Sequence, residues 1–217
     1  ADARSLRAAA WLDTKAVPTD REYLRLLEGA VASLADAGAQ IDHGVQPFGT
    51  EEKALQAMAI YVSLLQAGDP AFQQLGRAYS HGEWLALEVK RSFIKDAFQA
   101  FFDSYDVLLC PALPIPAFPH SSLGFTQRTY SGTGIPDFSG SDPNVGFWAG
   151  LFTVADLPAT VVPVGRTPSG LPCGMQIVAG NFQDLTAIGV GKILEQCHPG
   201  ARFAPPPSFG EQGASKL

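Results

Sequence analysis

The sequence has 217 residues, of which 46% are hydrophobic and 17% charged, a composition typical of one large globular unit or of part of a larger one. Its formal net charge is −6, and no lysine or arginine run offers the positive stripe that phosphates require, so we expect no nucleic-acid partner. No stretch approaches the roughly 20 uninterrupted apolar residues of a membrane helix, so we expect no membrane partner.

The first half of the chain predicts helices that alternate with short strands. Residues 5–12 fit either a buried strand or a helix end, because the segment is too short for its periodicity to decide. Thr19 and Glu22 stand at capping-box spacing before an apolar helical repeat, which predicts a helix that Gly38 ends. Further predicted elements are a strand at 39–46, helices at 50–67 and 82–102, and a buried strand at 105–112.

Residues 111–143 differ in character, because they are rich in proline, glycine and small hydroxyl residues and lack periodicity. A segment of this length is usually either a functional loop or a disordered one. Its aromatic residues, among them Phe118, Tyr130 and Phe138, favour an ordered loop, since disordered segments are poor in aromatics. We therefore expect this loop to form one wall of a pocket.

The next part of the sequence predicts an apolar helix at 144–155, a β-hairpin and a closing helix at 184–197. The hairpin strands, 159–165 and 173–179, flank a Thr-Pro-Ser-Gly segment suited to a type I turn. Pro163 lacks an N–H, so the first strand should have an edge or a bulge there. The closing helix is predicted to pack through Leu185, Ile188, Ile193 and Leu194, and residues 198–217 to form an extended or mobile tail.

Local motifs give no catalytic apparatus. No serine has glycine two residues away on both sides, as a nucleophile elbow requires, and a small hydrolase built on Ser131 or Ser139 with His120 therefore lacks support. The four histidines are dispersed, so we expect no metal. The run at 189–192 is incomplete as a phosphate loop, and we expect no cofactor. The three cysteines, Cys110, Cys173 and Cys197, are scattered, and the first two lie inside apolar runs, which indicates buried reduced thiols in a cytoplasmic protein.

Three segments, in chain order, resemble the C-terminal region of amidase-signature hydrolases. "GFWAGLFTVADLPATVVPVGRTPSGLPCGMQIVAGNFQDLTAIGVGKILE" at 146–195 is similar to the family's strand–turn–strand run and closing helix. "FFDSYDVLLCPALPIPA" at 101–117 resembles the strand before its substrate-pocket loop, and residues 8–41 resemble its middle segment. The resemblance implies an α/β fold, the C-terminal part of the amidase-signature fold, with a mixed β-sheet flanked by helices. On this interpretation the whole chain, 1–217, is the C-terminal half of the domain. It consists of a strand and helix segment at 1–110, the Pro/Gly-rich pocket loop at 111–143, a helix, hairpin and closing helix at 144–197, and a tail at 198–217.

The family's Ser–Ser–Lys triad lies in an upstream half that no segment here matches, so no catalytic residue is assigned. The first residues contain no initiator Met, and we expect the chain to begin partway through a longer protein. The resemblance implies that the complete enzyme hydrolyses a carboxylic amide through an acyl-enzyme. This half would supply sheet and pocket wall and be inactive alone. The alternative is a non-catalytic binding or scaffold protein derived from the same fold.

Four aromatic residues in or beside the loop are the candidate substrate-binding residues: Tyr130, Phe138, Phe147 and Trp148. For Phe147 and Trp148, a place in the core fits the sequence equally well. The expected partners are a small-molecule amide and the N-terminal catalytic half. Because a sheet cut through its middle exposes an edge strand and an apolar face, we also expect a homo-oligomer.

Overall fold

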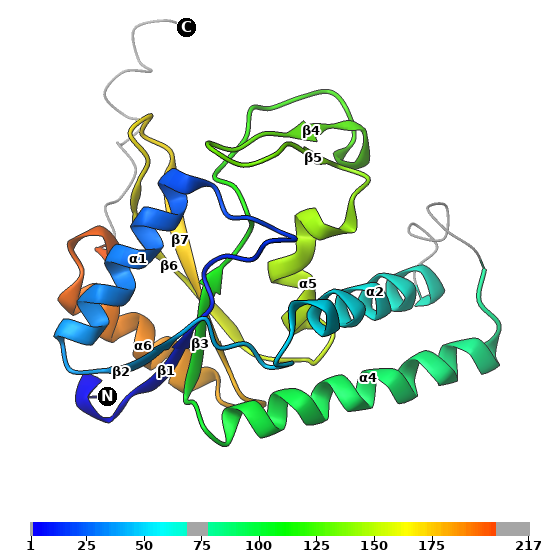
Figure 1. Cartoon of the computed structure of the whole chain (residues 1–217), viewed down its shortest axis with the longest axis horizontal. Helices are drawn as coiled ribbons and strands as arrows, with labels where there is room; N and C mark the ends of the chain where they lie inside the picture. The colour runs from blue at the N-terminus through cyan, green and yellow to red at the C-terminus, as the bar shows by residue number, and fades with distance from the viewer. Residues whose placement is uncertain (1, 69–77, 203–217) are drawn as a thin grey trace, which may run out of the picture.

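A mixed five-stranded sheet forms the centre of the computed structural model, which describes residues 2–68 and 78–202 (Figure 1). The strand order is β2-β1-β3-β7-β6. β1 pairs in parallel with β2 and β3, whereas β7 is antiparallel to both β3 and β6. This arrangement confirms the predicted fold class. The strands are β1 (Arg7–Ala10), β2 (Gln40–His43), β3 (Val107–Pro111), β6 (Ala159–Arg166) and β7 (Pro172–Ala179).

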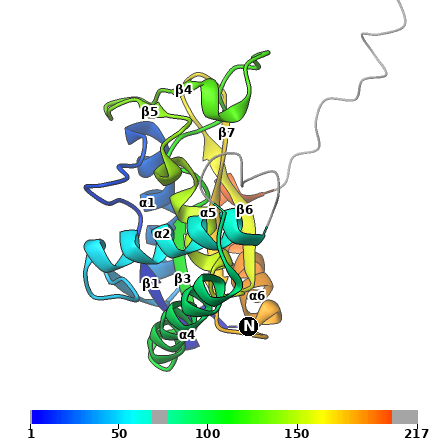
Figure 2. The ribbon, with the colours of Figure 1, turned by 90° about the vertical axis from the view of Figure 1, so that its right-hand side faces the viewer.

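Helices cover both faces of this sheet (Figures 1 and 2). Side chains alternate across β1, so that Ala8 and Ala10 join one apolar cluster and Ala9 joins the other. The first cluster is completed by α1 (Arg21–Asp36) and α6 (Asp184–Cys197). The second is completed by α2 (Glu51–Gly68), α4 (His81–Phe102) and α5 (Phe147–Thr153). β3 lies between the two clusters, and all five of its residues are buried.

The β6–β7 hairpin has the features that its sequence predicts. The Gly170 N–H donates to the Thr167 carbonyl over 2.8 Å and closes the turn. β6 is an edge strand, and its register with β7 shifts between Pro163 and Gly165. Gly165 has a φ of +139°, which a side chain rarely adopts. Both the edge and the bulge predicted at Pro163 are therefore confirmed.

Two details of helix packing differ from the prediction. Asp20, rather than Thr19, caps α1, because the Thr19 hydroxyl is buried and donates to the Leu12 carbonyl over 2.7 Å. On α6, Leu185 and Ile188 are 83% and 42% exposed and do not pack into the core. The other two predicted residues, Ile193 and Leu194, are buried as expected. Leu194 belongs to a buried stripe at i, i+3, i+4 and i+7 spacing that also contains Ala187, Val190 and Gly191.

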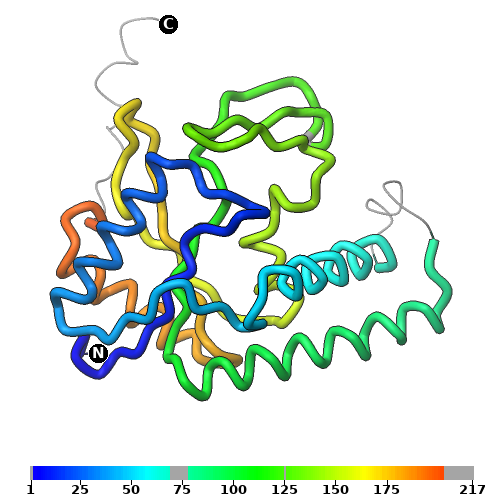
Figure 3. Tube along the Cα trace, in the orientation of Figure 1, coloured from blue at the N-terminus to red at the C-terminus, as the bar shows by residue number. Residues whose placement is uncertain are grey.

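The loop between β3 and α5 doubles back on itself (Figure 3), and it contains short elements of its own. These are the 3₁₀ turns η2 (Phe125–Gln127) and η3 (Pro143–Gly146), and a small antiparallel sheet of β4 (Thr129–Tyr130) and β5 (Phe138–Ser139). Near the chain ends lie two more 3₁₀ turns, η1 (Ala3–Ser5) and η4 (Pro199–Ala201). Of the predicted tail, residues 203–217 lie outside the described residues. Within 2–68 and 78–202, no helix combines the length and apolar character needed to cross a membrane.

Candidate functional site

A cavity of about 510 Å³ lies between α2, α5 and the end of the 111–143 loop. Apolar side chains of α2 form one side, and the loop end adds hydroxyl and carboxyl groups. The volume falls in the range of pockets that hold small organic molecules. The lining residues are Met58, Tyr61, Val62, Leu65, Gln66, Thr126, Gly140, Ser141, Asp142, Pro143, Gly146, Ala149 and Gly150.

Small residues on α5 create this space and bring the two helices together. A Cβ atom on Gly150 would lie 2.7 Å from the Tyr61 ring and 2.9 Å from Cε of Met58. Ala149 and Gly146 also line the cavity with little side-chain volume. Glycine at position 150 therefore permits the close approach of α2 and α5 that forms the cavity wall.

The loop end that closes the cavity has a defined conformation. The Asp142 carboxylate accepts from the Asn144 N–H over 2.9 Å and caps η3, where Pro143 occupies the first turn. The hydroxyl oxygens of Ser139 and Ser141 lie 2.7 Å apart. A molecule in the cavity would therefore meet hydroxyl and carboxyl groups on one side and α2 hydrocarbon on the other.

The four aromatic residues predicted to bind substrate are all buried in the cluster on this side of the sheet. The rings of Phe147 and Trp148 meet Trp11 edge-on, with centroids 5.7 and 4.9 Å away. Tyr130 faces Phe138 across the β4–β5 ladder. None of the four is among the residues that line the cavity, and their contact with a substrate stays a prediction.

A buried amide joins the sheet to α5. Nε2 of Gln176, on β7, donates to the Trp148 carbonyl over 3.1 Å and to Sγ of Cys110 over 3.3 Å. The indole N–H of Trp148 is buried and has no partner within the described part of the chain. Gln176 therefore fixes α5 relative to β3 and β7, which positions the side of the cavity that α5 forms.

The thiols are not activated as nucleophiles. Burial raises the pKa of Cys110 to about 12 and that of Cys173 to about 11. Burial also raises the pKa of Cys197. A thiol with a raised pKa stays protonated near neutral pH and is a poor nucleophile. In the same described residues, no three His, Cys, Asp or Glu side chains converge to hold a metal ion.

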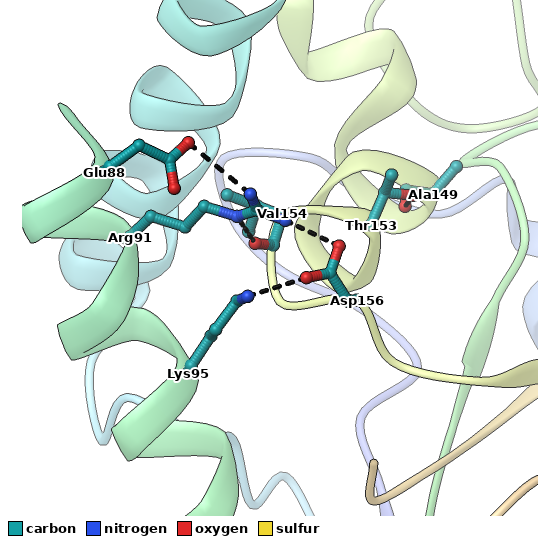
Figure 4. A network of polar contacts seen from close by, with 7 residues as sticks. All are labelled: Glu88, Arg91, Lys95, Ala149, Thr153, Val154 and Asp156. Atoms are coloured by element: carbon teal, nitrogen blue, oxygen red, sulfur yellow. Dashed lines mark hydrogen bonds and ion pairs between the residues drawn. The ribbon is translucent and has the colours of Figure 1, made fainter. Parts of the chain in front are cut away.

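Charged groups fasten the far end of α5 to α4 (Figure 4). Arg91 donates through Nε to the Val154 carbonyl and through Nη2 to Asp156, both over 2.6 Å. The Lys95 ammonium lies 2.7 Å from the other carboxylate oxygen of Asp156, and Glu88 lies 3.5 Å from Arg91. α5 is thus held at one end by this network and in its first turn by Gln176.

The mixed sheet, the helices on both faces and the loop-walled cavity define a segment of an α/β domain. Residues 63–187 match the model of the family described as Amidase. The match covers more than half of the chain, and the chain therefore belongs to the amidase family. This confirms the family that the sequence resemblance implied.

The matching proteins include a component of the glutamyl-tRNA(Gln) amidotransferase of Nitrobacter hamburgensis, 32% identical over 136 residues, and its counterpart from Rhodopseudomonas palustris, 31% identical over 163 residues. These alignments cover 60% and 73% of this chain but only 24% and 27% of the relatives, so the chain spans about a quarter of their length. A bacterial aryl acylamidase of the amidase-signature family is similar in structure, with a TM-score of 0.66 and 20% identity over 91% of this chain and 44% of that one. A fatty acid amide hydrolase gives a TM-score of 0.66 and 14% identity over 91% and 40%.

The α2 side of the cavity was not identified from the sequence. Met58 and Tyr61 belong to an apolar helical stripe, which indicates only that the helix packs against something. The pairing of this stripe with small residues on α5 is the signal that could have located the cavity.

Proposed function

We propose that this chain is part of an enzyme that hydrolyses a carboxylic amide, and that it supplies sheet strands and one wall of the substrate pocket. The observation that carries the proposal is the apolar cavity beside the loop in a chain whose residues 63–187 match the amidase family. The names of the similar proteins, which are an amidotransferase, an aryl acylamidase and a fatty acid amide hydrolase, refer to amide chemistry.

The cavity would hold the apolar part of the amide, against the hydrocarbon of α2 and the small residues of α5. Tyr130, Phe138, Phe147 and Trp148 would make this wall rigid, and they remain the proposed substrate-binding aromatics. The nucleophile and its proton acceptor would come from the N-terminal half, because the thiols of this chain are held protonated and no serine here carries an elbow motif. An acyl-enzyme formed there would be hydrolysed by water.

The N-terminal half would dock where apolar side chains remain uncovered. β6 is an edge strand of the described sheet, and Val161 on it is 55% exposed. Phe182 and Leu185, at the start of α6, are 95% and 83% exposed. Edge strands and apolar patches of this kind recruit another chain, which is here the N-terminal half or a second copy of this one.

The test is to assay amide hydrolysis by the purified chain, by the complete protein that its gene encodes, and by the chain mixed with the proposed N-terminal half. We expect no turnover by the chain alone and turnover by the other two. Turnover by the chain alone would overturn the division of labour. A complete protein that binds amides without hydrolysing them would favour the scaffold alternative.

A pair of variants links the activity to the cavity. Ala149→Leu narrows the cavity from its exposed side and should raise KM for bulky amides in the complete protein. Ala86→Leu makes the same chemical change on an exposed position of α4 outside the cavity and should leave KM unchanged. Equal KM values for the two variants would remove the cavity from the proposal.

A further inference from the structure

The 111–143 loop is fastened to the first turn of α1, far from it in sequence. The Asp20 N–H donates to the Pro114 carbonyl over 2.8 Å, and the Arg21 N–H donates to the Thr133 carbonyl over 2.9 Å. The Ala112 N–H donates to the Tyr23 hydroxyl over 3.2 Å, and that hydroxyl donates to the Gly174 carbonyl. One turn of helix thus holds the start of the loop and a point some 20 residues further along it.

The Asp20 carboxylate performs two tasks in this arrangement. Oδ1 accepts from the N–H groups of Glu22 and Tyr23, both over 2.9 Å, and caps the helix. Oδ2 accepts from the Thr133 N–H over 2.5 Å. The residue is only 3% exposed, and a buried charge-assisted bond of this kind is strong. A helix cap alone needs one oxygen, so the second oxygen is available to hold the loop.

Close packing accompanies these hydrogen bonds. Gly134 has a φ of +71°, and a Cβ on it would lie 2.8 Å from Cγ of Arg21. A Cβ on Gly132 would lie 2.7 Å from Ile135 and 3.0 Å from Ile115, so the outgoing and returning parts of the loop also touch each other. A side chain at position 134 would therefore crowd Arg21, and glycine permits this close approach of the loop to the helix.

We propose that Asp20 is a positioning residue for the substrate pocket, and that it acts through its hydrogen bond to the Thr133 N–H in the loop. The loop continues from Thr133 through β5 to Gly140–Pro143, which closes the cavity. A shift at Thr133 is transmitted along this short connection to the cavity wall. The expected effect on catalysis rests on the proposed function, but the hydrogen bond between Asp20 and Thr133 can be tested without any activity.

Two variants separate the loop contact from the helix cap. Asp20→Ser keeps a favoured N-cap residue but lacks a second oxygen for Thr133. Asp20→Asn keeps Oδ1 for the cap and places an NH₂ group against the Thr133 N–H. The matched control is Ser80→Ala, which removes the N-cap of α4 and touches no part of the loop.

The readout is amide hydrogen exchange in the full chain. In both Asp20 variants, amides at 128–138 should exchange roughly 10-fold faster or more, while those of Glu22 and Tyr23 keep their protection. Ser80→Ala should leave the loop unchanged. Unchanged loop exchange in both Asp20 variants would overturn the proposal. Equal loss of protection in loop and helix, or a faster-exchanging loop in Ser80→Ala, would reduce Asp20 to a cap and overturn it as well.

The complete protein gives the second readout. Asp20→Ser should raise KM for an aryl amide about 10-fold and change kcat less than KM, because the reacting groups lie elsewhere. A fall in kcat with KM unchanged would contradict a positioning role. If the complete protein hydrolyses no amide while the exchange result holds, the proposed function fails and the loop contact stands. If the complete protein hydrolyses amides while loop exchange in the Asp20 variants is unchanged, the proposed function stands and the positioning role of Asp20 fails.

Discussion

Asp156 has a left-handed backbone conformation that a Cβ atom disfavours, and its carboxylate forms two ion pairs. Its φ is +56°, in the left-handed region that non-glycine residues seldom adopt. Its carboxylate pairs with Arg91 over 2.6 Å and with Lys95 over 2.7 Å. Replacing Asp156 by Ala removes both pairs and keeps a Cβ in the left-handed region, whereas replacement by Gly removes the same pairs and relieves the conformation.

The difference between the two variants can be worked out from these terms. The carboxylate is 58% exposed, so each ion pair contributes only about 0.2–1 kcal/mol, and both variants lose this alike. A residue with a Cβ in the left-handed region costs about 1–2 kcal/mol. Asp156→Gly avoids this cost but loses about 0.4–1 kcal/mol of stability, because glycine increases the conformational entropy of the unfolded chain. We therefore expect Asp156→Gly to be about 0.5–1 kcal/mol more stable than Asp156→Ala.

Urea unfolding followed by circular dichroism measures this difference. Lys95→Ala, which removes one pair and leaves the backbone alone, is the control and should cost less than Asp156→Ala. The reasoning would be refuted if Asp156→Gly proved no more stable than Asp156→Ala, because the conformational term would then be absent.

Three further predictions concern other parts of the chain. Burial raises the pKa of Cys110 from 9.0 to about 12, so above pH 9 the folded chain keeps a proton that the unfolded chain loses. The free energy of unfolding, measured with urea at several pH values, should therefore fall as pH rises above 9, and it should fall less steeply in Cys110→Ala. Phe182 is 95% exposed with a φ of +63°, so Phe182→Gly should raise the free energy of unfolding by about 0.5–1 kcal/mol rather than lower it. Val161→Lys on the β6 edge should weaken self-association in light scattering, and a native chain that is monomeric at every concentration would contradict that expectation.

Local signals in the sequence were enough for much of the sheet. The β6–β7 hairpin was predictable because its turn residues and Pro163 have few conformations open to them. The strand β3 was predictable because an apolar run of this length ends at a proline. In each case the neighbours in sequence are also the residues that decide the structure.

Contacts between distant segments could not be predicted in this way. Thr19 and Asp20 are both good capping residues. The choice between them depends on distant partners, because Leu12 accepts from the Thr19 hydroxyl and Thr133 donates to the Asp20 carboxylate. Asp20 and Thr133 are 113 positions apart, and no pattern in either segment indicates the other. The exposure of Leu185 likewise depends on where α6 lies on the sheet, which its own periodicity does not fix.

The cavity and two of the aromatic residues proposed to bind substrate lie on the same short helix, α5. On α5, Phe147 and Trp148 point into the core, while Ala149 and Gly150 line the cavity. Space for a ligand requires small residues, and a wall that keeps its shape requires large buried ones directly behind them. The two groups alternate around one short helix, so the aromatic cluster and the cavity occur in the same stretch of sequence. A substitution that shrinks Trp148 would therefore change the pocket by loosening its support, even with every lining residue intact.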